Sequence, residues 1–454
     1  MSTRSLRRLL AGVAALALFA GVASAHGGLA ATQEGGTPVP TWLFLATGGG
    51  VVGASFLLAS FATDREFLTW VHRAARPLSL PRSALQWTGR AVGLLGLGLV
   101  LVSGFFGPTE AMRNAAILLV WAGWWAGYTM TVYLVGNSWP ALDPFRTLTL
   151  PLDEGLLDYD GSLGAWPSVV ALLTLVWVEV VSPVADDPRT LAALVVAYLG
   201  VVCLGAALVG RETWFDDLDP VARVFRLYGC VAPIQRGESG LELKFPGMAA
   251  VEAEPADDSE AAFVVALVWA TTFDGFTGTP LWTDVATALV GAGLPSALLY
   301  PGLLAVGYAV FLGVYWGACR TARRIAPTYR TAGNLARLFA PSLVAIAAAY
   351  HLAHYLSYFL QLSPALVQAV LTPLSGSSNP LLLSLPGWVG VLPVAFVLLG
   401  HLVAIWVAHS AAYGAFPDRV QALRSQYAVT VVMVFYTMTS LWIVTRPFSA
   451  PPYT

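Results

Sequence analysis

The chain has 454 residues, of which 57% are apolar and only 11% are charged, and its mean hydropathy is +0.69. This composition excludes an ordinary soluble globular protein and indicates a polytopic membrane protein. The 24 Lys and Arg nearly balance the 26 Asp and Glu, so there is no basic excess to bind nucleic acid. The three widely spaced cysteines favour neither a disulfide framework nor a thiolate metal site.

The first 25 residues have the pattern of a cleaved secretory signal peptide. Three arginines precede an apolar run from Leu9 to Val22, and Ala23-Ser24-Ala25 supplies the small residues that a signal peptidase requires. Cleavage after Ala25 leaves residues 26–454, which we expect to form a single transmembrane helical domain.

Ten further apolar runs have the length of membrane-spanning helices. Together they predict an all-α transmembrane bundle. In the sixth run Asp274 is followed by Gly275, Gly278 and Pro280, which predicts a broken helix. Irregular backbone at membrane depth is tolerated only where it lines a cavity. The expected spans lie near 41–62, 89–107, 115–135, 163–181, 191–210, 261–277, 294–317, 338–360, 388–413 and 426–444.

The distribution of basic residues predicts the orientation. Eighteen Lys and Arg lie in the loops 63–90, 211–260 and 318–337 and in the short loops after the third and ninth spans. Only three lie in the opposite loops and the C-terminal tail. Cytoplasmic loops carry the basic excess in membrane proteins. We therefore expect a multi-pass protein of the cell membrane with both mature termini outside. In the cytoplasmic loop 211–260 we expect an interfacial amphipathic helix, a short hairpin or turn in GESGLELKFPG and an acidic linker.

Histidines are the most distinctive polar residues of the apolar helices. Ionisable residues inside a span are costly and mark functional sites. His351 and His354 in AYHLAHYLSY are separated by about 4.5 Å of helical rise and point to one side, and His401 falls at a similar depth in the ninth span. His409 is about 12 Å of rise from His401, too far to share an ion. The sequence therefore predicts a metal site formed by His351, His354 and His401.

An added carboxylate would partly neutralise such an ion. Asp274 in the sixth span is predicted to orient or deprotonate a metal-bound water, and Glu179 in TLVWVEVVSP is the other acid at a compatible depth. Imidazole ligands suit zinc, copper or iron. The alternative for each histidine is structural, a hydrogen bond that holds two helices together.

Two further segments are given structural interpretations. The aromatic run VWAGWWAGYTMTVY is interpreted as helix packing and as aromatic belts at the membrane interface. NSWPALDPFR is interpreted as a turn in which Asp143 and Arg146 form an ion pair.

Several segments, in this order, suggest a family. They are NSWPALDPFR, WVEVVSP followed by DDPR, WATTFDGF, YHLAHYL, GHLVAIWVAH and RSQYAVTVVMV. From Asn137 to the last helix the chain resembles integral-membrane fenitrothion hydrolases, although the family's usual NPWR is here DPFR. The resemblance implies hydrolysis of an apolar organophosphorus triester, drawn from the membrane lipids, to a dialkyl phosphate and a phenol. The resemblance brings no catalytic residues with it. Apolar, neutral triesters partition into a bilayer, so such a substrate would reach the protein dissolved among the membrane lipids, not formed from them.

Three other functions fit the same residues. Midplane histidines beside a broken helix also suit a metal- or proton-coupled transporter, although no inverted repeat is evident. Histidines of the eighth and ninth spans could ligate one b-type haem. A scaffold without catalytic function would use the four histidines for stability alone.

Overall fold

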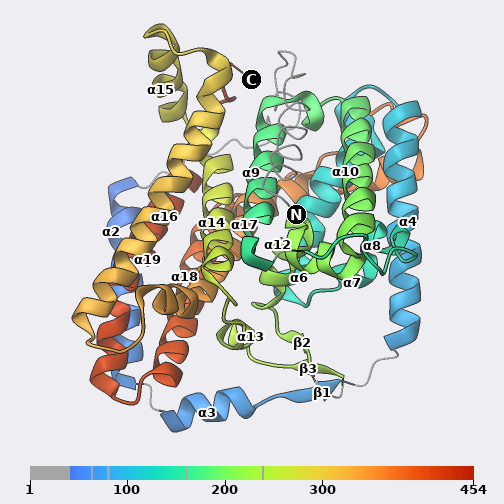
Figure 1. Ribbon diagram of the computed structural model, residues 1–454. Helices are drawn as coiled ribbons and strands as arrows, with labels where there is room; N and C mark the ends of the chain where they lie inside the picture. Colours follow the sequence, from blue (N-terminus) through green and yellow to red (C-terminus); the bar gives the residue numbers. More distant parts are fainter. Residues whose placement is uncertain (1–40, 63–64, 79–81, 160, 238–239, 454) are drawn as a thin grey trace.

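The computed structural model describes residues 41–62, 65–78, 82–159, 161–237 and 240–453 (Figure 1). Its architecture is a bundle of long helices, which confirms the predicted all-α class. In this described part, eight helical segments are long and apolar enough to cross a membrane. They are α4 (Arg82–Phe106), α5–η4–α6 (Ala115–Ile117, Leu118–Tyr128 and Thr129–Leu134), α10 (Pro188–Val209), α14 (Asp258–Thr277), α16 (Leu299–Ile325), α17 (Ala332–Leu371), α18 (Leu392–Ala415) and α19 (Arg419–Val444).

Two further predicted spans are helical but are not among these eight segments. The predicted signal peptide, residues 1–25, lies outside the described residues. α2 (Thr41–Ala62) matches the first predicted span. α9 (Trp166–Val181) has 16 residues and is therefore about 24 Å long, shorter than the hydrocarbon thickness of about 30 Å. The total of ten spans accordingly stays a prediction.

α17 is the central helix of the bundle. The Thr331 hydroxyl accepts the Asn334 N–H at its N-terminus, and the helix then runs 40 residues through Pro341 and Pro364. It packs against α14, η4, α16 and α18. Because α17 is surrounded in this way, polar side chains on it must find partners inside the protein.

A small sheet joins two loops at the base of the bundle, where α3 (Arg65–Arg73) lies across the helix ends (Figure 1). The hairpin or turn predicted in GESGLELKFPG is matched in part, because β3 (Leu241–Leu243) lies in this segment while its partner β2 (Ile234–Arg236) precedes it. β1 (Arg76–Leu78) pairs antiparallel with the other edge of β3. The loops 63–90 and 211–260, which the sequence assigns to one side of the membrane, therefore meet.

The amphipathic segment of the 211–260 loop forms α11 (Arg211–Thr213), η7 (Trp214–Leu218) and α12 (Pro220–Gly229). Its position at the lipid interface stays a prediction, but its apolar residues are buried in the protein. Phe215 and Phe225 are fully buried, and α12 packs under α6, α7, α9 and α17. Its buried Arg223 donates to Glu260 at 2.7 Å, so the charge that enters the protein is paired.

The predicted break in the sixth span is displaced. α14 continues unbroken through Asp274 to Thr277, and the chain turns at Gly278 before α15 (Pro280–Gly291), whose first N–H groups are capped by the Thr279 hydroxyl. Asp274 thus lies in the last turn of a regular helix. The remaining elements are η3 (Ala111–Arg113), α7 (Trp139–Leu142), α8 (Pro144–Leu148), η5 (Gly161–Leu163), η6 (Pro183–Ala185), α13 (Met248–Glu252), η8 (Ser296–Leu298) and η9 (Gly387–Val391).

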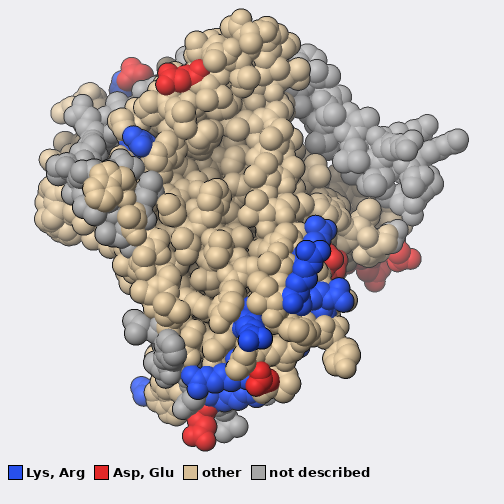
Figure 2. All heavy atoms as spheres, turned by 90° about the vertical axis from the view of Figure 1, so that its left-hand side faces the viewer, with Lys and Arg blue, Asp and Glu red and all other residues tan. Residues whose placement is uncertain are grey.

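The loops assemble at two opposite ends of the bundle. At one end Arg330 donates to the Ala415 carbonyl at 3.4 Å, and at the other Arg113 donates to the Ser377 carbonyl at 2.7 Å. On the face in Figure 2, most Lys and Arg lie toward the end that carries α3, and a broad region above them is uncharged. The alternation of loops expected from the sequence is therefore preserved in the fold.

Candidate functional site

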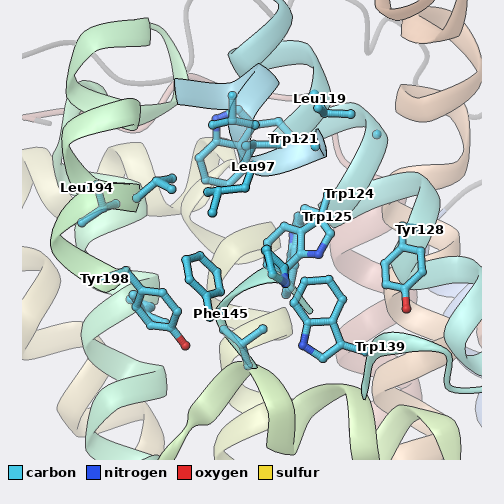
Figure 3. A pocket seen from close by; sticks show the side chains of 18 of the residues that line it. Leu97, Leu119, Trp121, Trp124, Trp125, Tyr128, Trp139, Phe145, Leu194 and Tyr198 are labelled. Carbon is cyan, nitrogen blue, oxygen red and sulfur yellow. The ribbon is translucent and has the colours of Figure 1, made fainter. Parts of the chain in front are cut away.

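An aromatic cavity of about 470 Å³ lies among α4, η4, α9 and α10. α7, α8 and α12 contribute the rest of its wall, and Gly93 of α4 lets the Leu142 carbonyl approach to within 1.8 Å of where a Cβ would stand. In Figure 3, Trp124, Trp125 and Trp139 stand on one side of the cavity and Leu194 and Tyr198 on the other. The volume falls within the range of roughly 300–1,000 Å³ typical of small-molecule sites.

The tryptophans of this cavity come mainly from η4, which is wound as a π-helix. Such stretches occur mostly at functional sites. The indole nitrogens of Trp124 and Trp139 are buried and have no hydrogen-bond acceptor among the described residues. The interpretation of VWAGWWAGYTMTVY as packing and interface belts was therefore incomplete, because several of its rings line a cavity.

Glu179 is the one acidic residue on the cavity wall formed by the described residues. It is half-buried near the end of α9 and forms neither a hydrogen bond nor an ion pair with any described residue. An unpaired carboxyl group in an apolar wall is costly unless a proton or a ligand neutralises it. The sequence placed Glu179 at the right depth, but it could not show that the side chain faces a cavity.

Asp274 and His354 are the two predicted site residues that the structure brings together. His354 Nε2 lies 3.4 Å from Asp274 Oδ2, and Tyr355 donates its hydroxyl to the same oxygen at 2.7 Å. All three side chains are largely buried, and the His354 ring lies parallel to that of Tyr350. A carboxylate, an imidazole and a phenol in contact form a chain along which a proton can move.

This polar cluster adjoins the wall of the cavity. The carboxyl groups of Glu179 and Asp274 are close enough to interact electrostatically, and both act on Tyr355 and Tyr358 of α17. The ring of Trp125, on the cavity wall, packs edge-on against Tyr355 with centroids 6.4 Å apart. The cavity and the proton-carrying cluster therefore adjoin.

Both ring nitrogens of His351 contact neighbouring groups of the protein. Its Nε2 contacts the Trp125 carbonyl at 3.1 Å and its Nδ1 contacts the Tyr133 hydroxyl at 3.0 Å. A neutral ring satisfies both when Nε2–H donates to the carbonyl and Nδ1 accepts the hydroxyl proton. With both nitrogens engaged, ligation of a metal would break one of these bonds.

His401 and His409 lie apart from this cluster. His401 is buried and donates from Nδ1 to the Val397 carbonyl of its own helix at 2.7 Å, while its Nε2 has no partner among the described residues. His409 contacts Gln426 at 3.3 Å and packs on Tyr413.

The described residues contain no group of three or more His, Cys, Asp or Glu that could hold a metal ion. Protein metal sites commonly supply three or four ligands, so the adjacent pair His354 and Asp274 falls short of one. The arrangement does not fit the predicted three-histidine site, and the divalent metal stays a prediction from the sequence.

A second buried acidic group lies at the other end of the cavity. Asp143 caps α8 by accepting the N–H groups of Phe145 and Arg146, and burial, with a further contribution from Asp219, raises its pKa to about 7. The prediction of an ion pair between Asp143 and Arg146 was wrong. The Arg146 guanidinium instead contacts Glu212 of α11 at 3.2 Å and Asp216 of η7 at 3.4 Å. The role of the Asp143 carboxyl group is therefore to cap α8.

Comparison of the chain with protein-family models, with curated proteins and with solved structures gave no match. The functional argument therefore rests on the site alone, beside the resemblance drawn from the sequence.

Proposed function

We propose that the protein is an integral-membrane hydrolase that takes an apolar ester, such as an organophosphorus triester, into the aromatic cavity. The observation that carries the proposal is the unpaired carboxyl group of Glu179 on the wall of this cavity, in electrostatic contact with Asp274. Neutral triesters partition into the bilayer, and an apolar cavity between helices suits a substrate that arrives from there.

In the proposed reaction Glu179 removes a proton from a water molecule, and the water oxygen attacks phosphorus. The bond from phosphorus to the aryloxy oxygen breaks, and the phenolate leaves and takes up a proton. The tryptophan rings of the cavity wall pack against the apolar groups of the substrate and hold it beside Glu179. Asp274, with His354 and Tyr355, holds the proton that Glu179 exchanges during the cycle.

The proposal includes the location that the sequence predicts, a multi-pass protein of the cell membrane with a cleaved signal peptide and both mature termini outside. It is supported by the meeting of β1 and β3, which joins two basic loops at one end of the bundle. Glu179 and Asp274 both lie near the ends of their helices at the opposite end. In this orientation the proposed site opens in the outer half of the bilayer.

The test is release of the phenol from fenitrothion by purified protein in lipid nanodiscs. Glu179→Gln keeps the shape of the side chain and removes the base, and it is expected to lower kcat by about 10² to 10⁴. Asp274→Asn is expected to lower the rate less and to change its pH profile. Asp284→Asn, on the exposed face of α15, is the matched control and is expected to leave the rate unchanged.

Absence of turnover by wild type, or full activity of Glu179→Gln, would contradict the proposal. Metal analysis of the same preparations tests the sequence prediction separately. A stoichiometric metal ion that wild type binds and His354→Ala does not bind would support a metal site that includes His354. If His354→Ala binds as much metal as wild type, His354 is not a ligand.

A second function is favoured by the proximity of the Glu179 and Asp274 carboxyl groups. Two acids that share a buried site exchange protons, which suits a proton-coupled carrier of an apolar solute. Solute-driven pH change in proteoliposomes tests this function; no pH change, or one that Glu179→Gln leaves intact, would contradict it.

A further inference from the structure

We propose that the aromatic cavity is a binding site for lipophilic organic cations, with Glu179 as their counter-ion. The proposal concerns binding alone and does not require hydrolysis. It arises from the combination of an unpaired carboxyl group with a wall made largely of aromatic rings.

The wall supplies aromatic faces at several heights. Trp121, Trp124, Trp125 and Trp139 line the cavity, and Tyr198 and Phe145 line it from other elements (Figure 3). Tryptophan is the strongest of the side chains that attract cations to a ring face, and the attraction grows when water is excluded. Aryl or alkyl substituents of a cation would at the same time be buried against the leucines and valines of the wall.

The charges around Glu179 favour a cation over an anion. The titratable groups around Glu179 and its neighbours are Asp274 of α14, His354, Tyr355 and Tyr358 of α17, and Asp186, which follows η6. None is a lysine or an arginine, and among the described residues no Lys or Arg forms an ion pair with Glu179 or Asp274. When both carboxyl groups are ionised and His354 carries two ring protons, this group of side chains has one negative charge in excess, which a monovalent organic cation would neutralise.

A proton competes with the cation for the same place. When Glu179 is protonated the site loses its counter-charge, and only the aromatic attraction remains. Binding is therefore expected to weaken on acidification and to release a proton when a cation enters. A neutral ligand of similar shape would not show this dependence.

The experiment is a titration of purified protein in nanodiscs with tetraphenylphosphonium, followed by quenching of tryptophan fluorescence, with triphenylphosphine oxide as the neutral probe. Wild type is expected to bind the cation saturably. Glu179→Gln is expected to weaken cation binding at least about tenfold and to leave the neutral probe within about twofold. Asp284→Asn, exposed on α15, is the control and is expected to bind both probes as wild type does.

Equal cation affinity in wild type and Glu179→Gln, or cation affinity in wild type that does not change between pH 5 and pH 8, would overturn the proposal. The pH measurement keeps the test valid if the variant fails to fold. Saturable, pH-dependent cation binding without any hydrolysis of fenitrothion would leave this inference standing and contradict the proposed hydrolase. Hydrolysis without cation binding would do the reverse.

Discussion

Replacement of Asp143 by asparagine should remove a pH-dependent loss of stability. Asp143 is 2% exposed, and its Oδ1 accepts the N–H groups of Phe145 at 2.9 Å and Arg146 at 3.1 Å. Asparagine offers an oxygen in the same place, so the cap of α8 is retained while the ionisable group is lost. The perturbation therefore isolates the cost of ionising a buried carboxyl group.

The magnitude follows from the difference between the two pKa values. Burial, and next the neighbouring Asp219, raise the pKa of Asp143 to about 7, whereas an unfolded carboxyl group titrates near 3.9. Between these values the unfolded chain is ionised while the folded protein keeps the proton, so stability falls as pH rises from about 4 to about 7. At about 1.4 kcal/mol per pH unit, the loss between pH 5 and pH 7 is about 3 kcal/mol.

The assay is thermal unfolding in detergent at pH 5, 6, 7 and 8. The Tm of Asp143→Asn is expected to rise relative to wild type by several degrees across this range, with little further change above pH 7. Other titrating groups are shared by both proteins and largely cancel in the difference. A Tm difference that stays constant from pH 5 to pH 8 would refute the reasoning.

Two further substitutions test the packing that supports the site. In Gly275→Ala the new Cβ would stand 1.9 Å from the Tyr350 hydroxyl, so the Tyr350 ring beside His354 must shift. We expect the substitution to lower the free energy of unfolding by about 1–3 kcal/mol and to lower the hydrolysis rate. An unchanged Tm would contradict this expectation. Arg223→Met removes the shorter of the two ion pairs of Glu260 and leaves the contact with Arg226 at 3.8 Å, so the expected cost is about 2 kcal/mol. Glu260→Gln in the same chain should recover part of the loss, and its failure to do so would show that the charge pair is not the cause.

The apolar runs predicted the positions of the helices well, because a span must be long and apolar whatever it contacts. The same physical rule singled out Asp274 and His354, since a charge inside a span is costly. These two residues do meet in the fold. Their contact depends on the facing of α14 and α17, which tertiary packing determines.

Other parts of the site could not be inferred. The i, i+3 spacing of His351 and His354 predicts a shared face, yet His351 finds its partners in the Trp125 carbonyl and the Tyr133 hydroxyl on the neighbouring helical segment. The π-helical winding of η4 departs from the 3.6-residue period used to interpret a sequence, so the cavity tryptophans were taken for packing residues. The position of Glu179 on the cavity wall could not be inferred for a different reason, because the side that this residue faces depends on how α9 packs.

The central claim is that Glu179 presents a carboxyl group to a cavity reachable from the bilayer. Dicyclohexylcarbodiimide tests this most directly, because this apolar reagent adds to protonated carboxyl groups within membranes to give a stable N-acylurea that peptide mass spectrometry locates. The account predicts labelling at Glu179 that tetraphenylphosphonium slows and that Glu179→Gln abolishes. Labelling confined to other carboxyl groups, with Glu179 unmodified in folded protein, would contradict it.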